Sequence, residues 1–187
     1  LEQLGQQNSQ NHRLRVVDLG AGTGANLRYM APRLGGEQHW LLLDSDAELL
    51  GLLPERLRQW STRTGFVVER RRKLIVIRGP NFECQVRSLL LDLSCELDKC
   101  EFAGQSLVTP SALLDLVSES WLRDLAVRCY VNGVVVCFAL TYDGRIQLNP
   151  AVSLDQRVRE LVNRHQCADK GFGPALGSQA VEVAKQI

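Results

Sequence analysis

The sequence lacks several features that would assign it to a specialised class of protein. Its longest strongly apolar run, Val134 to Leu140, is far shorter than the roughly 18 residues that a membrane-spanning helix needs. Neither sign of charge is in excess, since 22 lysines and arginines stand against 21 aspartates and glutamates. No repeat with a period of about 20 to 50 residues occurs. With 45% hydrophobic and 23% charged residues in 187, the composition excludes a disordered tail or a collagen-like chain and fits one globular domain.

Closely spaced cysteine pairs and a secretory signal are also absent. No two of the six cysteines form the short knuckle that zinc sites favour, so we expect no metal site and reduced thiols in a cytoplasmic protein. The stretch Glu2 to His12 is polar and has no apolar signal core. We expect residues 1–12 to be a flexible N-terminus that precedes a single domain at 13–187. The cysteines are Cys84, Cys95, Cys100, Cys129, Cys137 and Cys167.

Short apolar runs alternate with helical stripes in the first third of the chain. The runs Leu14–Val17 and Trp40–Leu43 are each followed by an aspartate, as expected for buried strands that end at a site. Gly35-Gly36 should end the first helix, and Pro54 should kink or split the second. This alternation predicts an α/β fold, with a doubly wound, mostly parallel sheet and helices on both faces. The helical stripes are Leu27, Met30, Ala31 and Leu34, then Leu49, Leu50, Leu53, Leu57 and Trp60.

The middle of the chain predicts a small β insertion near 66–86. Phe66–Val68, Leu74–Ile77 and the alternating residues of 82–86 have the pattern of strands joined by tight turns. They precede a further main strand that ends in Asp92.

Beyond residue 105 we expect a short strand, a helix and a buried strand. Ser111 should cap a helix that runs to about Arg128. Val134–Leu140 should form a central, fully buried strand. A capping-box spacing at Ser153 predicts another helix, on which His165 falls in phase with the apolar stripe and should be half-buried.

The clearest motif follows the first strand. The run Val16–Leu27 reads V-V-D-L-G-A-G-T-G-A-N-L and resembles the first motif of the class I S-adenosylmethionine-dependent methyltransferases. Trp40–Asp46, followed by Leu49 and Leu50, is similar to the second motif of that family, and Leu91–Leu93 is similar to its third. The matches span about the first half of the chain. They imply a Rossmann-like methyltransferase fold that binds S-adenosylmethionine.

The resemblance also implies roles for individual residues. Asp18, helped by Asn26, would lie near the methionine part of the cofactor, where a carboxylate can bind the ammonium group. Asp44 would accept the ribose hydroxyls and Asp92 the adenine amino group, while the Leu93 N–H would donate to the adenine ring. Ligands of doubly wound sheets do bind at the carboxyl ends of strands, and glycines let the backbone approach a nucleoside closely. The expected cofactor set is Asp18, Gly20, Ala21, Gly22, Gly24, Asn26, Asp44, Ser45, Asp92, Leu93 and Thr109.

Two other functions remain as alternatives. Gly20, Gly22 and Ala25 satisfy the loose dinucleotide pattern, so the chain could be an NAD-dependent oxidoreductase. Against this, the carboxylate of Asp18 would repel a pyrophosphate. The chain could also be a non-catalytic module that only binds S-adenosylmethionine. In a purely structural interpretation, the strand-end acids cap helices and Gly24 allows close helix packing.

Signals for the methyl acceptor are weaker. The segment Thr109–Ser111, where the family builds part of its acceptor site, does not match the Asn-Pro-Pro-aromatic motif of amino-methylating nucleic-acid enzymes. The basic cluster Arg70–Lys73 is more typical of a solvated turn than of a phosphate contact. We therefore expect a small-molecule acceptor and neither a nucleic-acid nor a membrane partner, with a protein acceptor as the alternative. A catalytic base is not identified, and in-line methyl transfer does not require one.

The C-terminal third yields fewer expectations. Tyr142 follows the predicted buried strand and could orient an acceptor, although a tyrosine at the sheet rim is the simpler interpretation. The glycine-rich segment 166–177 has the composition of either a mobile loop or a plain connector. The family's core ends in an antiparallel hairpin, so we expect C-terminal strands to be missing. The alternative is a homodimer that covers the exposed edge of the fifth strand.

Overall fold

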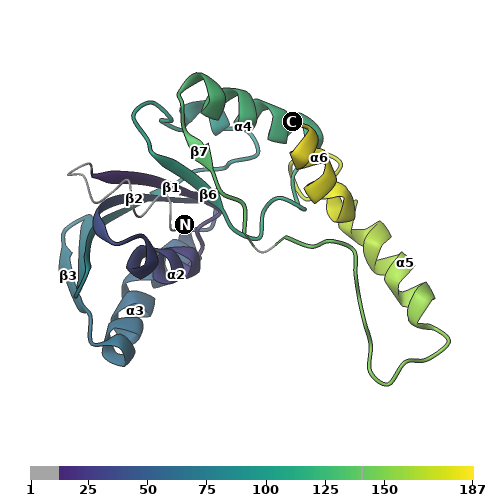
Figure 1. Cartoon of the computed structure of the whole chain (residues 1–187), viewed down its shortest axis with the longest axis horizontal. Coiled ribbons are helices and arrows are strands. Elements are labelled where there is room, and N and C mark those ends of the chain that lie inside the picture. Colours follow the sequence, from purple (N-terminus) through teal and green to yellow (C-terminus); the bar gives the residue numbers. More distant parts are fainter. Residues whose placement is uncertain (1–12, 140) are drawn as a thin grey trace.

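The computed structural model describes residues 13–139 and 141–187. The expectation for residues 1–12, and the end of the predicted strand at Leu140, therefore lie outside the described residues. The described chain is built on a seven-stranded sheet with the order β3-β4-β5-β2-β1-β6-β7 (Figure 1). The strands are β1 (Leu14–Leu19), β2 (Gly36–Asp44), β3 (Val67–Arg71), β4 (Leu74–Gly79), β5 (Phe82–Leu90), β6 (Leu107–Pro110) and β7 (Val135–Val136).

The central strands are parallel. β1 pairs with β2 on one side and with β6 on the other, and β5 and β7 extend the parallel set outwards. β3 and β4 form a hairpin that adds antiparallel strands to the edge at β5. Because parallel strands share one direction, the carboxyl ends of β1, β2, β5 and β6 meet at one edge of the sheet.

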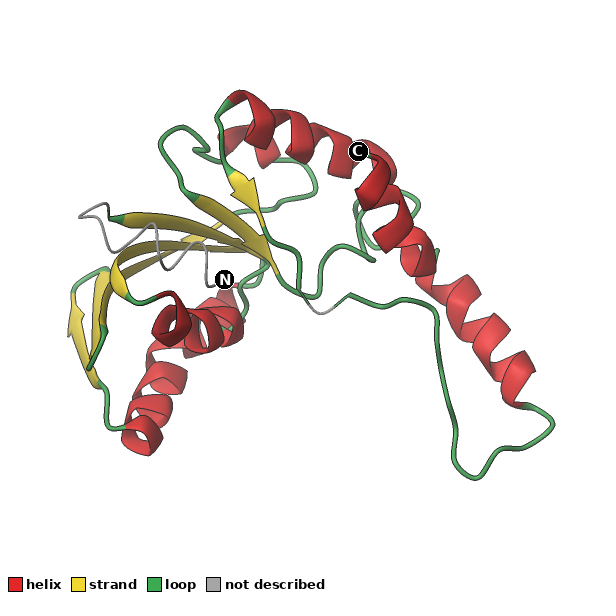
Figure 2. Cartoon of the chain, viewed as in Figure 1, coloured by secondary structure: helices red, strands yellow, loops and turns green. Residues whose placement is uncertain are grey.

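Helices cover both faces of the sheet (Figure 2). α2 (Ala25–Leu34) and α3 (Ala47–Thr64) pack their apolar stripes on one face, against Val16, Trp40 and Leu42. α4 (Glu119–Val131) and the C-terminal segment with α6 (Ala180–Gln186) pack on the other face, against Val17 and Val108. This arrangement confirms the predicted α/β fold with a mostly parallel, doubly wound sheet.

The glycine turn after β1 opens α2, as the sequence predicted. Gly24 is the N-cap of α2 with a φ of 77°, a conformation that residues with a Cβ rarely adopt. A Cβ on Gly24 would also lie 2.6 Å from Leu53 Cδ1 of α3. Gly35, with a φ of 65°, ends α2 by donating its N–H to Ala31 O.

The prediction that Pro54 splits the second helix was wrong, and a kink at Pro54 stays a prediction. α3 is continuous from Ala47 to Thr64, with Pro54 inside it. The helix is fixed at its start by Asp46, whose carboxylate accepts the N–H groups of Glu48 and Leu49, and along its length by buried Leu53 and Leu57.

Two boundaries differ from the sequence expectations. β5 runs unbroken from Phe82 to Leu90, so the alternating residues 82–86 belong to the main strand and not to a separate one. α4 begins only at Glu119, where Ser118 rather than Ser111 is the N-cap. Ser111 instead makes an isolated bridge to Ala139, and the next residue, Ala112, has a φ of 56° that does not fit a helix.

The strand predicted at 134–140 was expected to be central and fully buried, and this was wrong. β7 spans only Val135–Val136 and lies at the edge of the sheet, with Val135 exposed. Its apolar run resembles a core strand because Val134 and Val136 pack on α4 and its neighbours. The hydrophobicity of a run does not show whether its strand will be central or at the edge of the sheet.

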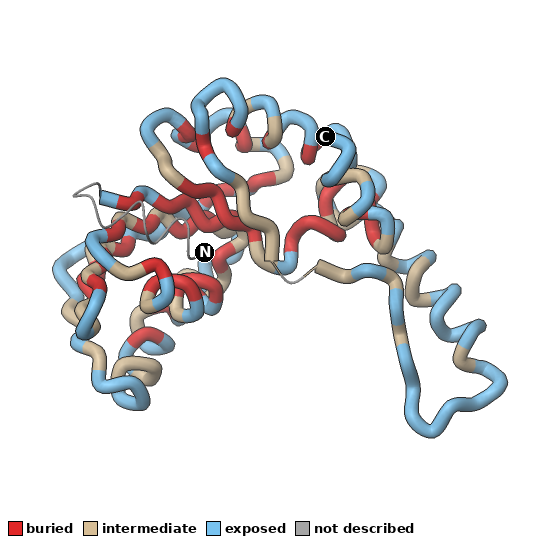
Figure 3. The backbone as a smooth tube through the Cα atoms, in the orientation of Figure 1, coloured by how far each residue is buried: buried red, intermediate tan, exposed pale blue. Residues whose placement is uncertain are grey.

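The C-terminal third is the most exposed part of the described chain (Figure 3). α5 (Asp155–Gln166) has no buried residue and begins without a side-chain cap, so the capping box expected at Ser153 does not form. His165 is exposed, not half-buried as expected. Short 3-10 turns occur at Leu97–Lys99 (η1) and Gly177–Gln179 (η2). Within the described ranges, no helix combines the length and apolar character needed to cross a membrane.

Candidate cofactor site at the strand ends

A cavity of about 410 Å³ opens where the parallel strands end. We call it the strand-end cavity. Its volume lies within the roughly 300 to 1,000 Å³ of small-molecule sites. It is lined by Gly20, Asp44, Ser45, Asp92, Leu93, Ser94, Ser111, Ala112, Leu113, Leu116, Lys170, Gly171 and Phe172. The fold thus brings together residues that follow β1, β2 and β5 and lie far apart in the sequence.

The Asp44 carboxylate ties the glycine turn to the end of β2. Asp44 Oδ2 accepts the N–H of Gly22 at 2.7 Å, and Oδ1 accepts the N–H of Asp46 at 2.9 Å. The turn is also held by the N–H of Ala21, which donates to Leu43 O. A carboxylate offers about four acceptor positions, so Asp44 keeps capacity for two further donors on the side of the cavity.

Asp92 is held in a tight turn just beyond β5. Its Oδ1 accepts both the N–H and the hydroxyl of Ser94, at 2.9 and 2.7 Å, while its own N–H donates to Glu96. These bonds to Ser94 lower the pKa of Asp92 below its ordinary value, so the group is anionic at neutral pH. The Cys95 thiol also lowers the pKa of Asp92 through a side-chain hydrogen bond. In the described part of the chain, the N–H of Leu93 makes no hydrogen bond. One anionic acceptor and one donor are therefore available side by side.

Asp18 lies beneath the cavity and not in its wall. The side chain is fully buried, and its Oδ1 accepts from Asn26 Nδ2 at 3.0 Å. The same amide donates to Thr109 Oγ1 at 3.0 Å, which joins β1, α2 and β6 in one buried polar cluster. Asp18 Oδ2 has no partner among residues 13–139 and 141–187. A buried carboxylate oxygen without a donor is costly, and a cationic group placed beside it would remove that cost.

Burial raises the pKa of Asp18 to about 7. The hydrogen bond from Asn26 opposes the shift, and the nearby negative charge of Asp44 adds to it. Asp18 thus changes its charge near neutral pH in the absence of a cation, which ordinary strand-end aspartates do not do.

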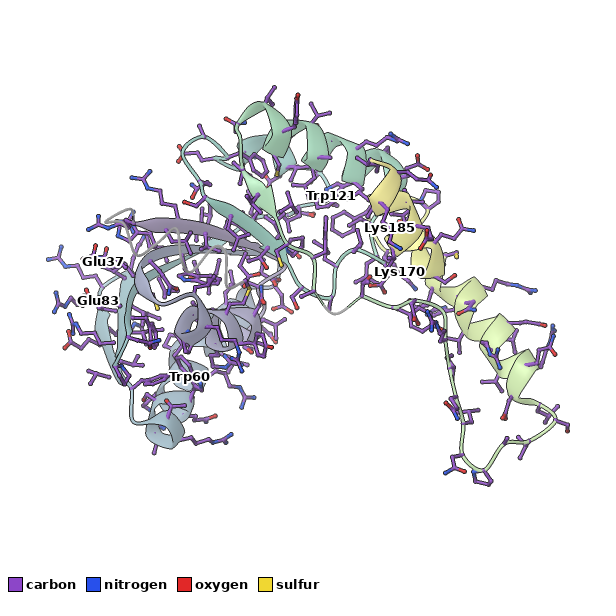
Figure 4. The ribbon with its side chains drawn as sticks, viewed as in Figure 1. Glu37, Trp60, Glu83, Trp121, Lys170 and Lys185 are labelled. Atoms are coloured by element: carbon purple, nitrogen blue, oxygen red, sulfur yellow. The ribbon has the colours of Figure 1, made fainter. Side chains whose placement is uncertain are left out.

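The cavity has a wall that the sequence did not assign to the cofactor site. Trp121 of α4 donates from Nε1 to Leu93 O at 2.7 Å and packs edge-to-face on Phe172, with ring centroids 5.5 Å apart. Asp169 Oδ1 accepts the N–H groups of Gly171 and Gly173 and so shapes the turn that carries Lys170. Figure 4 shows Trp121 of α4 close to this C-terminal segment. The signal in the sequence was only the glycine-rich composition of 166–177.

The expected site residues fall into two groups. Gly20, Asp44, Ser45, Asp92 and Leu93 line the strand-end cavity. The others belong to the glycine turn or to the buried cluster beneath it: Asp18, Ala21, Gly22, Gly24, Asn26 and Thr109. Tyr142 does not line the cavity, because its hydroxyl donates to Asn163 Oδ1 of α5 at 2.6 Å.

Metal ligands and disulfides are not part of this site. In the ranges that the structure covers, no cluster of three or more His, Cys, Asp or Glu side chains is placed to hold a metal ion. The six cysteines are free thiols. Burial raises the pKa of Cys84 to about 12 and the pKa values of Cys100 and Cys129 to about 11, so these three are unreactive core residues.

Comparison with known proteins identifies the fold. No family model and no curated protein matches the sequence. Among solved structures, an arsenic(III) S-adenosylmethionine methyltransferase from Chlamydomonas reinhardtii matches 92% of this chain and 50% of its own chain, with a TM-score of 0.50 and 16% sequence identity. A SAM-dependent methyltransferase from Aquifex aeolicus matches 88% of this chain and 77% of its own, with a TM-score of 0.46 and 13% identity.

The chain therefore has the class I methyltransferase fold. It spans half the length of the Chlamydomonas structure. At this level of identity the likeness establishes the fold, and the activity has to be argued from the site.

Proposed function

We propose that this chain is an S-adenosylmethionine-dependent methyltransferase domain that acts on a small-molecule acceptor. The observation that carries the proposal is the convergence of Asp44, Asp92 and the Leu93 N–H on one cavity, at the strand ends where doubly wound sheets bind nucleotides. Each of these groups has hydrogen-bonding capacity left over in the described structure.

The residues fit the cofactor group by group. Asp44 would accept the two ribose hydroxyls through its remaining acceptor positions. Asp92 Oδ2 and the Leu93 N–H would bind the adenine amino group and a ring nitrogen. Asp18 Oδ2, which has no partner in the described ranges, would contact the ammonium group. This contact would favour the ionised carboxylate and lower its pKa.

The chain's own residues would contribute mainly by positioning. When bound, S-adenosylmethionine supplies a methyl group activated on its sulfonium sulfur. The glycine turn and the three aspartates would hold the cofactor, while Ser111, Lys170 and Phe172 on the opposite wall would bring an acceptor close and in line. The C-terminal wall would also limit the entry of water and of large acceptors, which favours a small molecule.

Replacement of Asp44 tests the proposed ribose contact. Asp44→Ala should weaken binding of S-adenosylhomocysteine by about 10- to 100-fold, the loss expected for hydrogen bonds to a charged group. Isothermal titration measures the effect, with Asp98→Ala as the control because Asp98 is an exposed aspartate outside the cavity. Asp44→Asn keeps one acceptor oxygen, so its affinity should lie between that of the Asp44→Ala variant and that of the Asp98→Ala control. Unchanged affinity in a folded Asp44→Ala variant would contradict the ribose assignment.

Fractionated acceptors test the small-molecule assignment. The chain is incubated with S-adenosylmethionine and either the low-molecular-mass or the macromolecular fraction of a cell extract, and S-adenosylhomocysteine is quantified. We expect product with the low-molecular-mass fraction. Product only with the macromolecular fraction would transfer the assignment to a protein or nucleic-acid acceptor, and no product with either would favour a non-catalytic binding module.

A further inference from the structure

Among the described residues, one part of the sheet has no helix on one of its faces. The crossovers after β1 and β2 contain α2 and α3, which both pack on the same face. The crossover from β5 to β6 contains only η1 in the described structure, and its buried residues pack toward α4. Within residues 13–139 and 141–187, no helix therefore covers the opposite face of β2 and β5. This face is hollowed by a cavity of about 280 Å³, which we call the sheet-face cavity.

Basic and polar side chains from three strands line this cavity. Arg15 of β1, His39 of β2 and Gln85 of β5 are register partners in one row across the sheet. Arg87 lies two residues beyond Gln85 on the same face, and it also lines the cavity. Gln105, from the crossover before β6, closes one end. The cavity therefore brings His39 together with two arginines and two side-chain amides.

The acidic residues on this face are already paired. Glu37 accepts from Arg13 at 3.2 Å, and Glu69 and Glu83 accept from Arg78 at 2.9 and 2.8 Å. Glu37 and Glu83 are register partners and lie together at the end of the sheet (Figure 4). No carboxylate pairs with Arg15 or Arg87 in the described part of the chain. Two positive charges are therefore left unbalanced at the cavity.

The excess of positive charge at the cavity also affects His39. Its Nε2 is buried and has no hydrogen-bond partner among the residues with described positions. Partial burial lowers the pKa of His39, and the positive charges of Arg13, Arg15 and Arg87 lower it further, against a smaller opposing effect of Glu37. An anion between the two free arginines would balance their charge and would give the imidazole an acceptor when it is protonated.

We propose that the sheet-face cavity binds the phosphate group of a small polar molecule. A tetrahedral dianion presents oxygens to two guanidinium groups at once, and the planar guanidinium is suited to such contacts. Gln85 and Gln105 supply amide donors and acceptors for the rest of the ligand. This site is separate from the strand-end cavity, with which it shares no lining residue.

The charge pattern favours a small ligand over a nucleic-acid strand. Proteins that bind nucleic acid tightly make about 6 to 10 phosphate contacts. This cavity has two arginines, Arg15 and Arg87, without an ion pair in the described part of the chain. A longer polyanion would also approach the carboxylates of Glu37 and Glu83 at the end of the sheet, or that of Glu69 on the edge strand β3. The site therefore matches one phosphate group and not a phosphate backbone.

Titration with phosphates that lack adenine tests the proposal independently of the methyltransferase site. The probes are inorganic phosphate and ribose 5-phosphate, with acetate as a singly charged control anion and a ten-residue oligouridine as the polyanion. Affinity is measured by isothermal titration in a phosphate-free buffer. The imidazole resonances are followed by NMR, which is simple because the chain has 3 histidines.

We expect saturable binding of ribose 5-phosphate, with a shift of the His39 resonance and a raised His39 pKa. Arg15→Gln and Arg87→Gln should each weaken this binding about tenfold or more. Arg63→Gln is the matched control, because Arg63 is an exposed arginine on α3 and has no ion pair in the described structure. It should bind as the unmodified chain does, and thermal unfolding verifies that all three variants are folded.

Three results would overturn the proposal. The His39 resonance and the titration heat could remain unchanged with both phosphates. The Arg63 variant could lose as much affinity as the Arg15 and Arg87 variants, which would indicate nonspecific attraction. Oligouridine could bind more tightly than ribose 5-phosphate through the same two arginines, which would assign the face to nucleic acid. None of these results bears on S-adenosylmethionine binding.

Discussion

At the scale of single residues, Asp18 is the most informative group in the chain. It is fully buried, and one of its carboxylate oxygens has no partner among the residues that the structure describes. An apolar residue at this place would pack without that cost, so the carboxylate is better explained by a ligand than by folding. Ionisation of Asp18 without a ligand should therefore destabilise the domain, and this consequence can be measured.

Asp18→Asn should change how stability depends on pH. Because burial raises the pKa of Asp18 to about 7, the folded chain keeps a proton that the unfolded chain releases above about pH 4. Stability from this group is full below that pH and is lost as the pH rises to about 7. Urea unfolding at several pH values should show that the amide variant gains stability relative to the unmodified chain over this range, by an amount on the order of a few kcal/mol. A difference that is independent of pH would contradict the assigned pKa.

At the scale of elements, the contact between the glycine turn and α3 fixes the wall of the site. Gly24 has a positive φ, and Leu53 of α3 occupies the space that a side chain would need. The sequence suggested both a cofactor role and a packing role for this glycine. The geometry supports the packing role, since Gly24 does not line the cavity.

Gly24→Ala should lower the free energy of unfolding by about 1 to 3 kcal/mol, through backbone strain and overpacking against Leu53. Denaturant unfolding measures the change. Leu53→Ala added to Gly24→Ala should cost less than the sum of the two single changes. Gly51→Ala is the control, because Gly51 also lies on α3 and a Cβ there would have no neighbour within 4 Å. This change should raise the free energy of unfolding by about 0.5 to 1 kcal/mol. A neutral Gly24→Ala change would contradict the packing role.

α5 should be the least protected helix of the described chain. It has no buried residue, and its Val158 and Leu161 are exposed, as is the N-cap residue Leu154. Isolated helices of this length are marginal in water. Hydrogen exchange should therefore be fast at α5 and slow at β1 and β2, whose side chains form the core. Protection of α5 equal to that of β1 would show that another surface covers it.

At the scale of the whole molecule, the two halves differ in how far the sequence predicts them. In the first half, strong local signals agree: a buried strand, a glycine turn with positive φ values at Gly20, Gly22 and Gly24, and a helix with a clear apolar stripe. The convergence of Asp44 and Asp92 then follows from the rules for parallel sheets, whereas the strand order comes from the structure.

In the second half, tertiary contacts override the local signals. Ser111 has the features of a helix cap, yet it follows β6 and forms a bridge with Ala139. The helix α4 begins only after its N-cap residue Ser118. The apolar run at 134–140 has no periodicity that separates an edge strand from a central one. The wall at Lys170 and Phe172 depends on Trp121, far away in the sequence, so composition alone could not place it.

The central claim is that the strand-end cavity binds the adenosyl cofactor, and isothermal titration of the unmodified chain tests it most directly. The ligands are S-adenosylmethionine, S-adenosylhomocysteine and NAD, in the same buffer. We predict saturable binding of both adenosyl compounds and no heat with NAD. Binding of NAD alone would contradict the account and assign the site to an oxidoreductase, and no binding of any of the three would contradict a cofactor site in this chain.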